Sequence, residues 1–393
     1  VLIKIFISMG IGFFIALSIG YFNFWLEGFN HIIKGVKVFT KFPQQIPVLF
    51  NGAVVYSTEI PANYLIINLL YTLPLYILII SIVSVWAFLR FIYKEDKKTM
   101  LIFILFCFIF PIWYIIYSSA SIYDKWRHIA FTYPFLLIFG LWGLTCISKL
   151  KSIPIKIGIT ICIIIFFSKT LVWNVQHYPF QTAYFNEIIG GTEGAWLQQE
   201  LDPQQQGVRP CFEYLLKEKD FKKLLNQRDS NNPIIIACFS QGLDKEYINI
   251  SPSIKNKIKI VNTGYKMGYS NQKWDYGIFG SLFVSPEILQ ISFPPKGTIY
   301  KAAVNDIPLA VLVKRENNFD IDGIAAIREN NIPLATELLA KSYQYDQSNF
   351  RIWNYYAYTL LLQGKLNEAK ELAYKYNELF PGDQLSNQIL QRN

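Results

Sequence analysis

LIFILFCFIFPIWYIIYS (residues 101–118) and AFTYPFLLIFGLWGLTCIS (residues 130–148) are long apolar runs, and YDKWRH (residues 123–128) stands between them. Each run is long enough to form a helix that crosses the roughly 30 Å hydrocarbon core of a bilayer. Charged groups at the mouth of such helices are costly unless they are anchored, paired or used in function. The pattern therefore predicts a helical membrane protein, and residues 123–128 are named the polar island below.

Apolar runs of this length are concentrated in the first 174 of the 393 residues. Because lipid offers no partner for backbone N–H and C=O groups, such runs should be helical. We predict a polytopic α-helical membrane domain at 1–175. Its five transmembrane helices are expected at about 4–24, 65–89, 101–118, 130–148 and 157–174. Residues 31–41 are expected to form either an amphipathic helix on the membrane surface or a plain connector.

Charge is also uneven along the chain. Residues 1–174 contain 14 of the 37 basic residues but only 5 of the 28 acidic ones, and the remainder is balanced. The positive-inside bias places the basic connectors 90–98 and 149–156 in the cytoplasm, so the polar island and everything after residue 175 face outward. The basic excess lies beside the membrane rather than on a soluble face, so no nucleic-acid partner is predicted.

The chain beyond the membrane reads as two further domains. Residues 176–316 are predicted to form a small α/β domain. Helical periodicity runs through 209–226. Buried strands are expected at 233–239 and 258–261, and a hairpin at 298–304 and 309–314.

Residues 317–393 are predicted to form an α-helical hairpin tail that resembles tetratricopeptide repeats. Ala335 and Ala369 are 34 residues apart, and Asn330 stands where Gly364 recurs. From Trp353 onward several residues occupy signature positions of that repeat, namely Trp353, Tyr356, Ala357, Gly364, Glu368, Ala369 and Pro381. Two interpretations stay open: the tail binds a protein partner, or it caps the α/β domain.

Cysteine and histidine residues give little sign of a metal centre. His31, His128 and His177 are far apart in the sequence, so no metal site is predicted. No cofactor is predicted, and a divalent metal is left open. A disulfide between Cys211 and Cys238 is also left open.

The polar island supports two interpretations from its residues alone. Arg127 carries a permanent charge on a fork that suits phosphate, and His128 can donate a hydrogen bond or shuttle a proton. At an outward membrane mouth, the matching ligand is a lipid-linked phosphate. The alternative is that Lys125, Trp126 and Arg127 are interfacial anchors and that Asp124 pairs with one of them.

Several motifs add a family resemblance. The polar island, followed by Phe131, Tyr133 and Pro134, resembles a late-span motif of the GT-C superfamily of glycosyltransferases. The closer likeness is to bacterial relatives of protein O-mannosyltransferases and aminoarabinose transferases. YPFQ (178–181) and YFNE (184–187), before Gly190 and Gly191, resemble their post-membrane motif. Their late outer loop is matched by FNG (50–52) with Pro61 and Tyr64, and their extracytoplasmic domain by WDYG (274–277) and FPPKGTIY (293–300).

The resemblance implies an inverting transfer of a sugar from a polyprenyl-phosphate donor to an extracytoplasmic acceptor, in a bacterial inner membrane. It implies that Arg127 and His128, with Tyr123 and Asp124, bind the donor phosphate. One motif departs from the family, because ELD (200–202) continues as PQQQ. The catalytic carboxylate is expected upstream of Val1, so no catalytic residue is assigned and the chain alone is expected to be inactive.

The remaining matched residues have mainly structural expectations. Gln181, Asn186 and Glu187 are expected to join the last span to the outer domain through hydrogen bonds, and Tyr64 to be a membrane anchor rather than a substrate contact. An alternative to the enzyme is a membrane-anchored scaffold whose tail recruits partners. A transporter is less favoured, since no acidic residue within a span marks an ion path.

Overall fold

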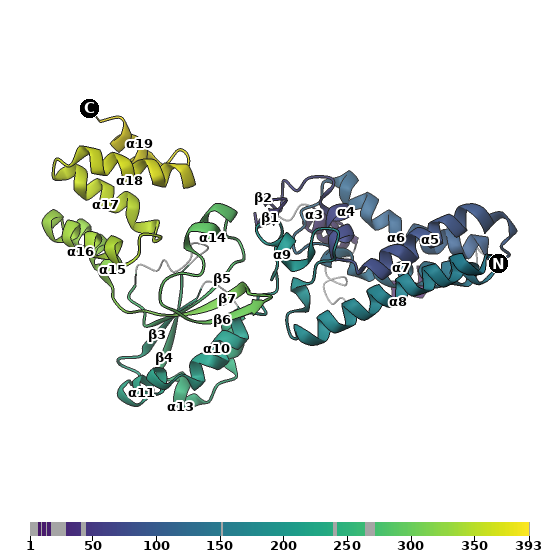
Figure 1. Ribbon diagram of the computed structural model, residues 1–393, viewed down its shortest axis with the longest axis horizontal. Coiled ribbons are helices and arrows are strands. Elements are labelled where there is room, and N and C mark those ends of the chain that lie inside the picture. The colour runs from purple at the N-terminus through teal and green to yellow at the C-terminus, as the bar shows by residue number, and fades with distance from the viewer. Residues whose placement is uncertain are drawn as a thin grey trace. The chain divides into compact units, whose positions relative to one another are not determined.

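The structure is a computed structural model that describes residues 7–8, 10–12, 14–16, 29–40, 45–150, 152–238, 242–263 and 272–392. It is mostly helical, at 60%, with a small sheet (Figure 1). The chain separates into two compact units. The first contains 1–48, 55–70 and 76–163, and the second contains 49–54, 71–75 and 164–393. Most of the predicted span 4–24 lies outside the described residues.

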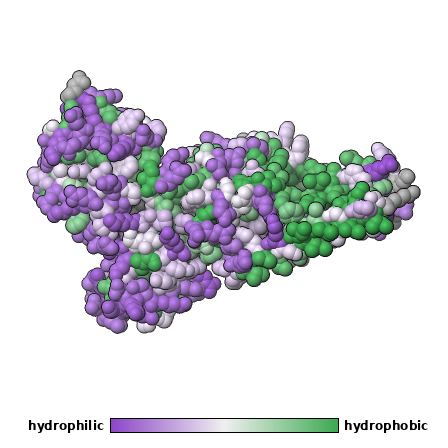
Figure 2. Space-filling view, in the orientation of Figure 1, coloured by the Kyte–Doolittle hydropathy of each residue, from purple (hydrophilic) through white to green (hydrophobic). Residues whose placement is uncertain are grey.

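Three helices are long and apolar enough to cross a membrane: α6 (Lys98–Ser118), α7 (Tyr133–Ser148, extended by the 3-10 helix η2, Arg127–Thr132) and α8 (Ile153–Gln176). They coincide with the predictions at 101–118, 130–148 and 157–174. Figure 2 shows hydrophobic side chains covering this helical region. Exposed examples on α8 are Ile164 and Leu171, at 57% and 53%. Such exposure is compatible with helices whose solvent is lipid.

The predicted helix at 65–89 is wrong as a single span. The segment forms α4 (Tyr64–Thr72) and α5 (Leu75–Phe91), which are bent by 114° to each other. Pro74 has no backbone N–H and disfavours a helical conformation at Leu73, so the helix ends there. Among the described residues this gives three candidate spans, or four if the bent pair counts as one; the predicted span at 4–24 stays untested.

The first unit packs its helices closely where side chains are small. Ser84 on α5 is fully buried, and its hydroxyl lies 3.3 Å from the carbonyl of Gly140 on α7. A Cβ atom built on Gly143 would lie 1.9 Å from the Ser84 Oγ, so only glycine fits at that crossing. At one end of the bundle Lys149 forms a 3.0 Å ion pair with Glu95, which joins the two basic connectors.

The remaining elements before the large sheet are short. The helix predicted at 31–41 is observed as α3 (Phe29–Thr40). Strands β1 (Pro47–Phe50) and β2 (Ala53–Tyr56) form a two-stranded sheet that was not predicted. The short helices are η1 (Ile92–Lys94), η3 (Gln181–Ala183) and α9 (Gly191–Ala195).

The second unit contains a five-stranded mixed sheet of order β4-β3-β5-β7-β6. Its strands are β3 (Ile234–Cys238), β4 (Ile258–Asn262), β5 (Tyr276–Gly280), β6 (Thr298–Val304) and β7 (Ile307–Lys314). β3 is parallel to β4 and β5, whereas β7 is antiparallel to β5 and β6. The two predicted strands and the hairpin are therefore present, and β5 was missed.

Alternating side chains of the sheet enter two different cores, as the pleat of a strand requires. Ile236 and Leu312 belong to the core that contains α10 (Val208–Lys217) and α11 (Lys219–Gln227). Ala237 and Val311, each one residue away in sequence, belong to the core that contains α14 (Pro286–Ser292) and the tail. The short helices α12 (Gly242–Ile248) and α13 (Pro252–Lys255) complete the α/β part.

The continuous helix expected through 209–226 is interrupted at Glu218. This residue takes an extended conformation and its side chain accepts a hydrogen bond from the Phe221 N–H, which makes it the N-cap of α11. Capping satisfies a donor that the first turn of a helix otherwise leaves open. The apolar periodicity continues across the break, because both helices pack on the same core.

The tail consists of α15 (Phe319–Arg328), α16 (Ile332–Tyr345), α17 (Arg351–Leu362), α18 (Leu366–Leu379) and α19 (Gln384–Leu390), each packed against the next (Figure 1). Ala335 and Ala369 are fully buried, as close helix packing demands. One apolar core runs from the sheet, through Val313 for example, into the tail at Leu339 and Trp353. The tail therefore covers its apolar face with the α/β domain.

Candidate functional site

The polar island begins in the loop that follows α6 and ends with the first two residues of η2, and its loop part is tightly turned. Ser119, Asp124 and Lys125 all have positive φ, at 47°, 55° and 60°. L-residues adopt such angles rarely, and they persist where surrounding contacts fix them. These angles therefore indicate that surrounding contacts fix the conformation of the loop.

Tyr64 supplies one of those contacts. Its side chain is 1% exposed, and its hydroxyl oxygen accepts a 2.9 Å hydrogen bond from the Lys125 N–H. The expectation that Tyr64 anchors the protein at the membrane interface is therefore wrong, because the ring is enclosed by protein. Its role is to hold the island loop. A second link is the 3.3 Å hydrogen bond from the Ile122 N–H to the Ser57 carbonyl.

Asp124 is buried at 8% exposure and forms a 2.8 Å ion pair with Arg127, whose side chain is 47% exposed. Burial raises the pKa of the Asp124 carboxyl, and the positive charges of Arg127 and Lys125 oppose that rise. The carboxylate contacts the Nη1 atom of the guanidinium. Because arginine has five N–H donors on a planar fork, this contact does not exhaust its capacity for hydrogen bonds.

Tyr123 contacts both exposed side chains of the island, Arg127 and His128. The Arg127 guanidinium lies 5.2 Å from the centroid of the Tyr123 ring, and the His128 ring meets the same ring edge to face at 4.9 Å. Arg127 and His128 are both exposed. The structure thus brings together Tyr123, Asp124, Arg127 and His128, the four residues predicted to contact a phosphate, with a cation and an imidazole on the accessible side.

A small hollow of mixed polarity borders the island in the first unit. It is lined by side chains at the start of α4, at the end of α6 and in the island loop, including Leu65, Ile116 and Ile122. Ile122 precedes Tyr123 directly, so the hollow and the charged groups belong to the same loop. Sequence reasoning missed the hollow, because its walls come from segments more than fifty residues apart.

Asn186 lies in the second unit and has a structural task. It is 1% exposed; its side-chain N–H donates to the Leu73 carbonyl at 2.7 Å, and its backbone N–H donates to the Tyr71 carbonyl at 2.8 Å. These carbonyls lie where Pro74 interrupts the helix and leaves acceptors open. The post-membrane motif therefore caps the broken helix.

Gln181 and Glu187 are exposed and lie in the second unit, as Asn186 does. Glu187 is 3.7 Å from the Lys169 ammonium in an ion pair between exposed groups, which contributes little to stability. The structure shows no chemical task for Gln181.

The cysteines and acidic residues add no second centre of chemistry among the described residues. Cys211 and Cys238 are both buried and are not joined to each other, so the disulfide left open from the sequence is not formed. Burial raises the pKa of the Cys211 thiol to about 12. In the described part of the chain, no three His, Cys, Asp or Glu side chains gather as a metal site would require.

Comparisons of the chain with protein-family models, with curated proteins and with solved structures find no match.

Proposed function

We propose that this chain is part of an integral-membrane glycosyltransferase that moves a sugar from a polyprenyl-phosphate donor to an extracytoplasmic acceptor. One observation carries the proposal: Arg127 and His128 are exposed side by side at the start of η2, next to an island loop that the buried Asp124 and Tyr64 support. A guanidinium held in this way is pre-organised for a phosphate oxygen. The resemblance of the surrounding motifs to GT-C enzymes supports the same reading.

The chemistry assigned to the island is stabilisation of the leaving group. In an inverting transfer, the acceptor oxygen or nitrogen attacks the anomeric carbon, and the bond between that carbon and the phosphate oxygen breaks with its electron pair going to the phosphate. Arg127 and His128 would meet the negative charge that develops there. The proton of the acceptor goes to a general base, a role that we assign to no described residue.

Exposed apolar side chains beside the island favour a lipid over a soluble phosphate. A polyprenyl chain needs an apolar surface next to the phosphate contact, and Tyr117 at the end of α6 and Phe131 in η2 are 74% and 61% exposed. The Lys149–Glu95 ion pair brings the two basic connectors to the same end of the bundle, as the predicted orientation requires. It joins the two basic connectors, which the positive-inside bias assigns to the cytoplasm.

The proposal is tested in the organism that carries the gene, by replacing Arg127 with alanine and measuring lipid extracts by mass spectrometry. The Arg127→Ala strain is expected to accumulate an unconsumed polyprenyl-phosphate sugar. The matched control is Arg90→Ala, since Arg90 is another exposed arginine at a helix end. An unchanged pool of lipid-linked sugars in the Arg127→Ala strain contradicts the proposal.

A scaffold is the second candidate, and the tail offers the observation that favours it. Leu362 and Tyr374 are large side chains that remain 52% and 61% exposed on α17 and α18. Replacing both with serine should abolish partner recruitment if the tail is the working surface. Under the glycosyltransferase proposal the same change leaves the lipid-linked sugar pool as in the wild type.

A further inference from the structure

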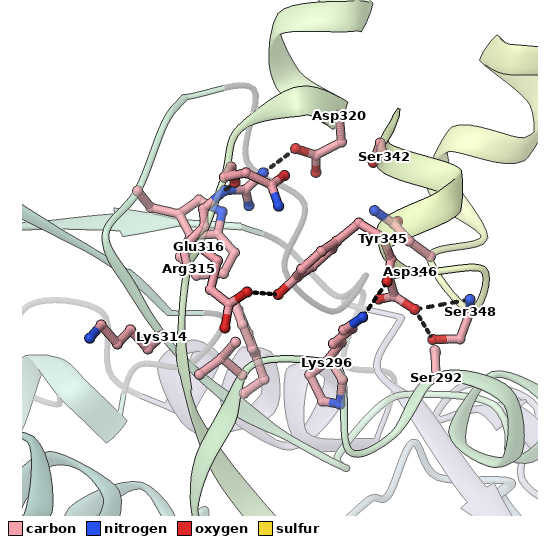
Figure 3. A pocket seen from close by; sticks show the side chains of 16 residues that line it. Ser292, Lys296, Lys314, Arg315, Glu316, Asp320, Ser342, Tyr345, Asp346 and Ser348 are labelled. Atoms are coloured by element: carbon pink, nitrogen blue, oxygen red, sulfur yellow. Dashed lines mark hydrogen bonds and ion pairs between the residues drawn. The ribbon is translucent and has the colours of Figure 1, made fainter. Parts of the chain in front are cut away.

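A pocket lies in the second unit where the sheet meets the tail (Figure 3). Its walls come from the segment after α14, the residues that follow β7 and the C-terminal end of α16, for example Lys296, Glu316 and Tyr345. The pocket is half-open and has a volume of about 90 Å³. A single small organic ring displaces a similar volume.

The charges around the pocket balance. Three cationic and three anionic side chains line it, and they are Lys296, Lys314, Arg315, Glu316, Asp320 and Asp346. Several are already compensated: Arg315 pairs with Asp320 in a nearly buried contact, and Lys314 pairs with Asp220 at 2.6 Å. A lining without net charge offers no general attraction to an anion or a cation, so a neutral ligand fits it better.

The aromatic surfaces of the pocket are held in place. The Tyr345 hydroxyl donates a 2.8 Å hydrogen bond to Glu316. The Lys296 ammonium donates to the Tyr345 carbonyl and lies 4.2 Å from the centroid of the same ring, a contact that Figure 3 shows from the side. On the other wall, Arg315 stacks 4.4 Å from the Trp274 ring centroid. A ligand therefore meets rings whose positions are fixed before it arrives.

Two polar atoms of the lining are buried and have no hydrogen-bond partner among the described residues. One is the Trp274 Nε1–H, a donor, and the other is the Asn349 Oδ1, an acceptor. Buried polar groups are ordinarily satisfied, and each exception asks for an explanation. Ser292, Ser342 and Ser348 also line the pocket. The Ser292 hydroxyl already donates to the Ile288 carbonyl and the Ser348 hydroxyl to Asp346, so these two can only accept from a ligand.

We propose that this pocket binds one sugar unit, a neutral ring with several hydroxyl groups. Hydroxyls both donate and accept, which matches the mixed polar lining, whereas the C–H faces of the ring can pack on aromatic surface. A half-open pocket of this size takes at most one unit, part of which stays in solvent, and the balanced charge favours an uncharged one. This proposal does not depend on the function of the membrane unit, because it rests only on residues of the second unit.

Saturation-transfer NMR on the purified full chain in detergent tests the proposal, with D-glucose, D-mannose and N-acetylglucosamine as probes. At least one sugar is expected to bind. Tyr345→Ala should weaken that binding about tenfold or more, because it removes the ring and the contacts it makes. The matched control is Tyr374→Ala, since Tyr374 is an exposed tail tyrosine outside the pocket. Tyr345→Phe keeps the ring and should retain binding.

A measurement without any variant guards against misfolding of Tyr345→Ala. Amide hydrogen exchange of residues 345–349 in the wild-type chain should slow when the bound sugar is added. The proposal is overturned if no sugar binds, if exchange in this segment is unaffected, or if binding survives in a folded Tyr345→Ala variant. Tighter binding of inorganic phosphate or glycylglycine than of any sugar also overturns it.

Discussion

Removal of the Asp320 carboxylate should destabilise the junction between the sheet and the tail. Asp320 and Arg315 are 8% and 10% exposed and form an ion pair. Truncating one partner of a buried pair costs about 3–5 kcal/mol, because it leaves the other charge buried without compensation. Arg315 is also held over Trp274 and by the Asn317 carbonyl, so it cannot turn freely into solvent.

The effect should be local, because Asp320 lies in the first turn of α15. Amide hydrogen exchange of α15 and α16 in the full chain measures the free energy of local opening. A loss of about 3 kcal/mol corresponds to exchange that is roughly 100-fold faster. The matched control is Asp322→Ala, two residues away. Its partner Lys273 is 60% exposed, so this pair should contribute less than about 1 kcal/mol.

A double variant separates the lost charge partner from lost packing. Arg315→Met combined with Asp320→Leu leaves no buried charge, so most of the protection in α15 should return. The reasoning is refuted if Asp320→Ala and Asp322→Ala change the exchange of α15 equally. It is also refuted if the double variant is as labile as Asp320→Ala alone.

Three further predictions concern other parts of the fold. Gly143→Leu should lower the thermal stability of the detergent-solubilised chain by several degrees, because the helix crossing has no space for a side chain, while Gly158→Leu meets nothing within 4 Å and should be neutral. Asn186→Ala should lower the free energy of unfolding by about 2–4 kcal/mol, because buried groups lose their hydrogen-bond partners. The loss should appear as faster proteolysis after α4, whereas Gln181→Ala should leave the proteolysis rate unchanged. Burial works against the charged form of Asp383, yet bonds from Ser386 and Asn354 outweigh it and lower its pKa. The stability that Asp383 gives α19 is therefore present above its ordinary pKa of 3.8 and lost as the pH falls through the lowered value. Hydrogen exchange of α19 should show that loss, and Asp383→Asn should remove it.

The features that follow from local chemistry were predictable from the sequence. The buried β-branched run became β3, and the alternating segments around Asn305 and Asp306 became β6 and β7. The repeat in the tail was also predictable, down to its turn residues. Asn330 and Gly364 end the first helix of successive pairs with φ of 59° and 78°, an angle that glycine and asparagine tolerate best. Their correspondence in the sequence thus marks equivalent turns.

The features that depend on direction or on distant partners were not predictable. Hydropathy at 65–89 reports composition, so it did not reveal that Pro74 turns the chain by 114°. Nothing near Asn186 in the sequence indicates that it caps a helix more than a hundred residues earlier. The burial of Tyr64 likewise depends on the island loop, which follows sixty residues later.

The candidate site shows both outcomes in one place. YDKWRH was recognised as the critical stretch because its charges are out of place between apolar runs. Pairing of Asp124 with Lys125, Trp126 or Arg127 was part of the interfacial-anchor interpretation, and the structure identifies Arg127 as the partner. The hollow beside Ile122 was not foreseen. Residue type indicated the chemistry, and only the fold indicated which groups are accessible.

The central claim is that Arg127 contacts a lipid phosphate, and its most direct test is the affinity of the purified chain for a polyprenyl phosphate relative to the matching polyprenol. The two lipids share the apolar chain and differ in the phosphate alone. The wild type should prefer the phosphate by about tenfold or more, and Arg127→Ala should lose that preference while binding the alcohol as before. An equal preference in both proteins would contradict the claim.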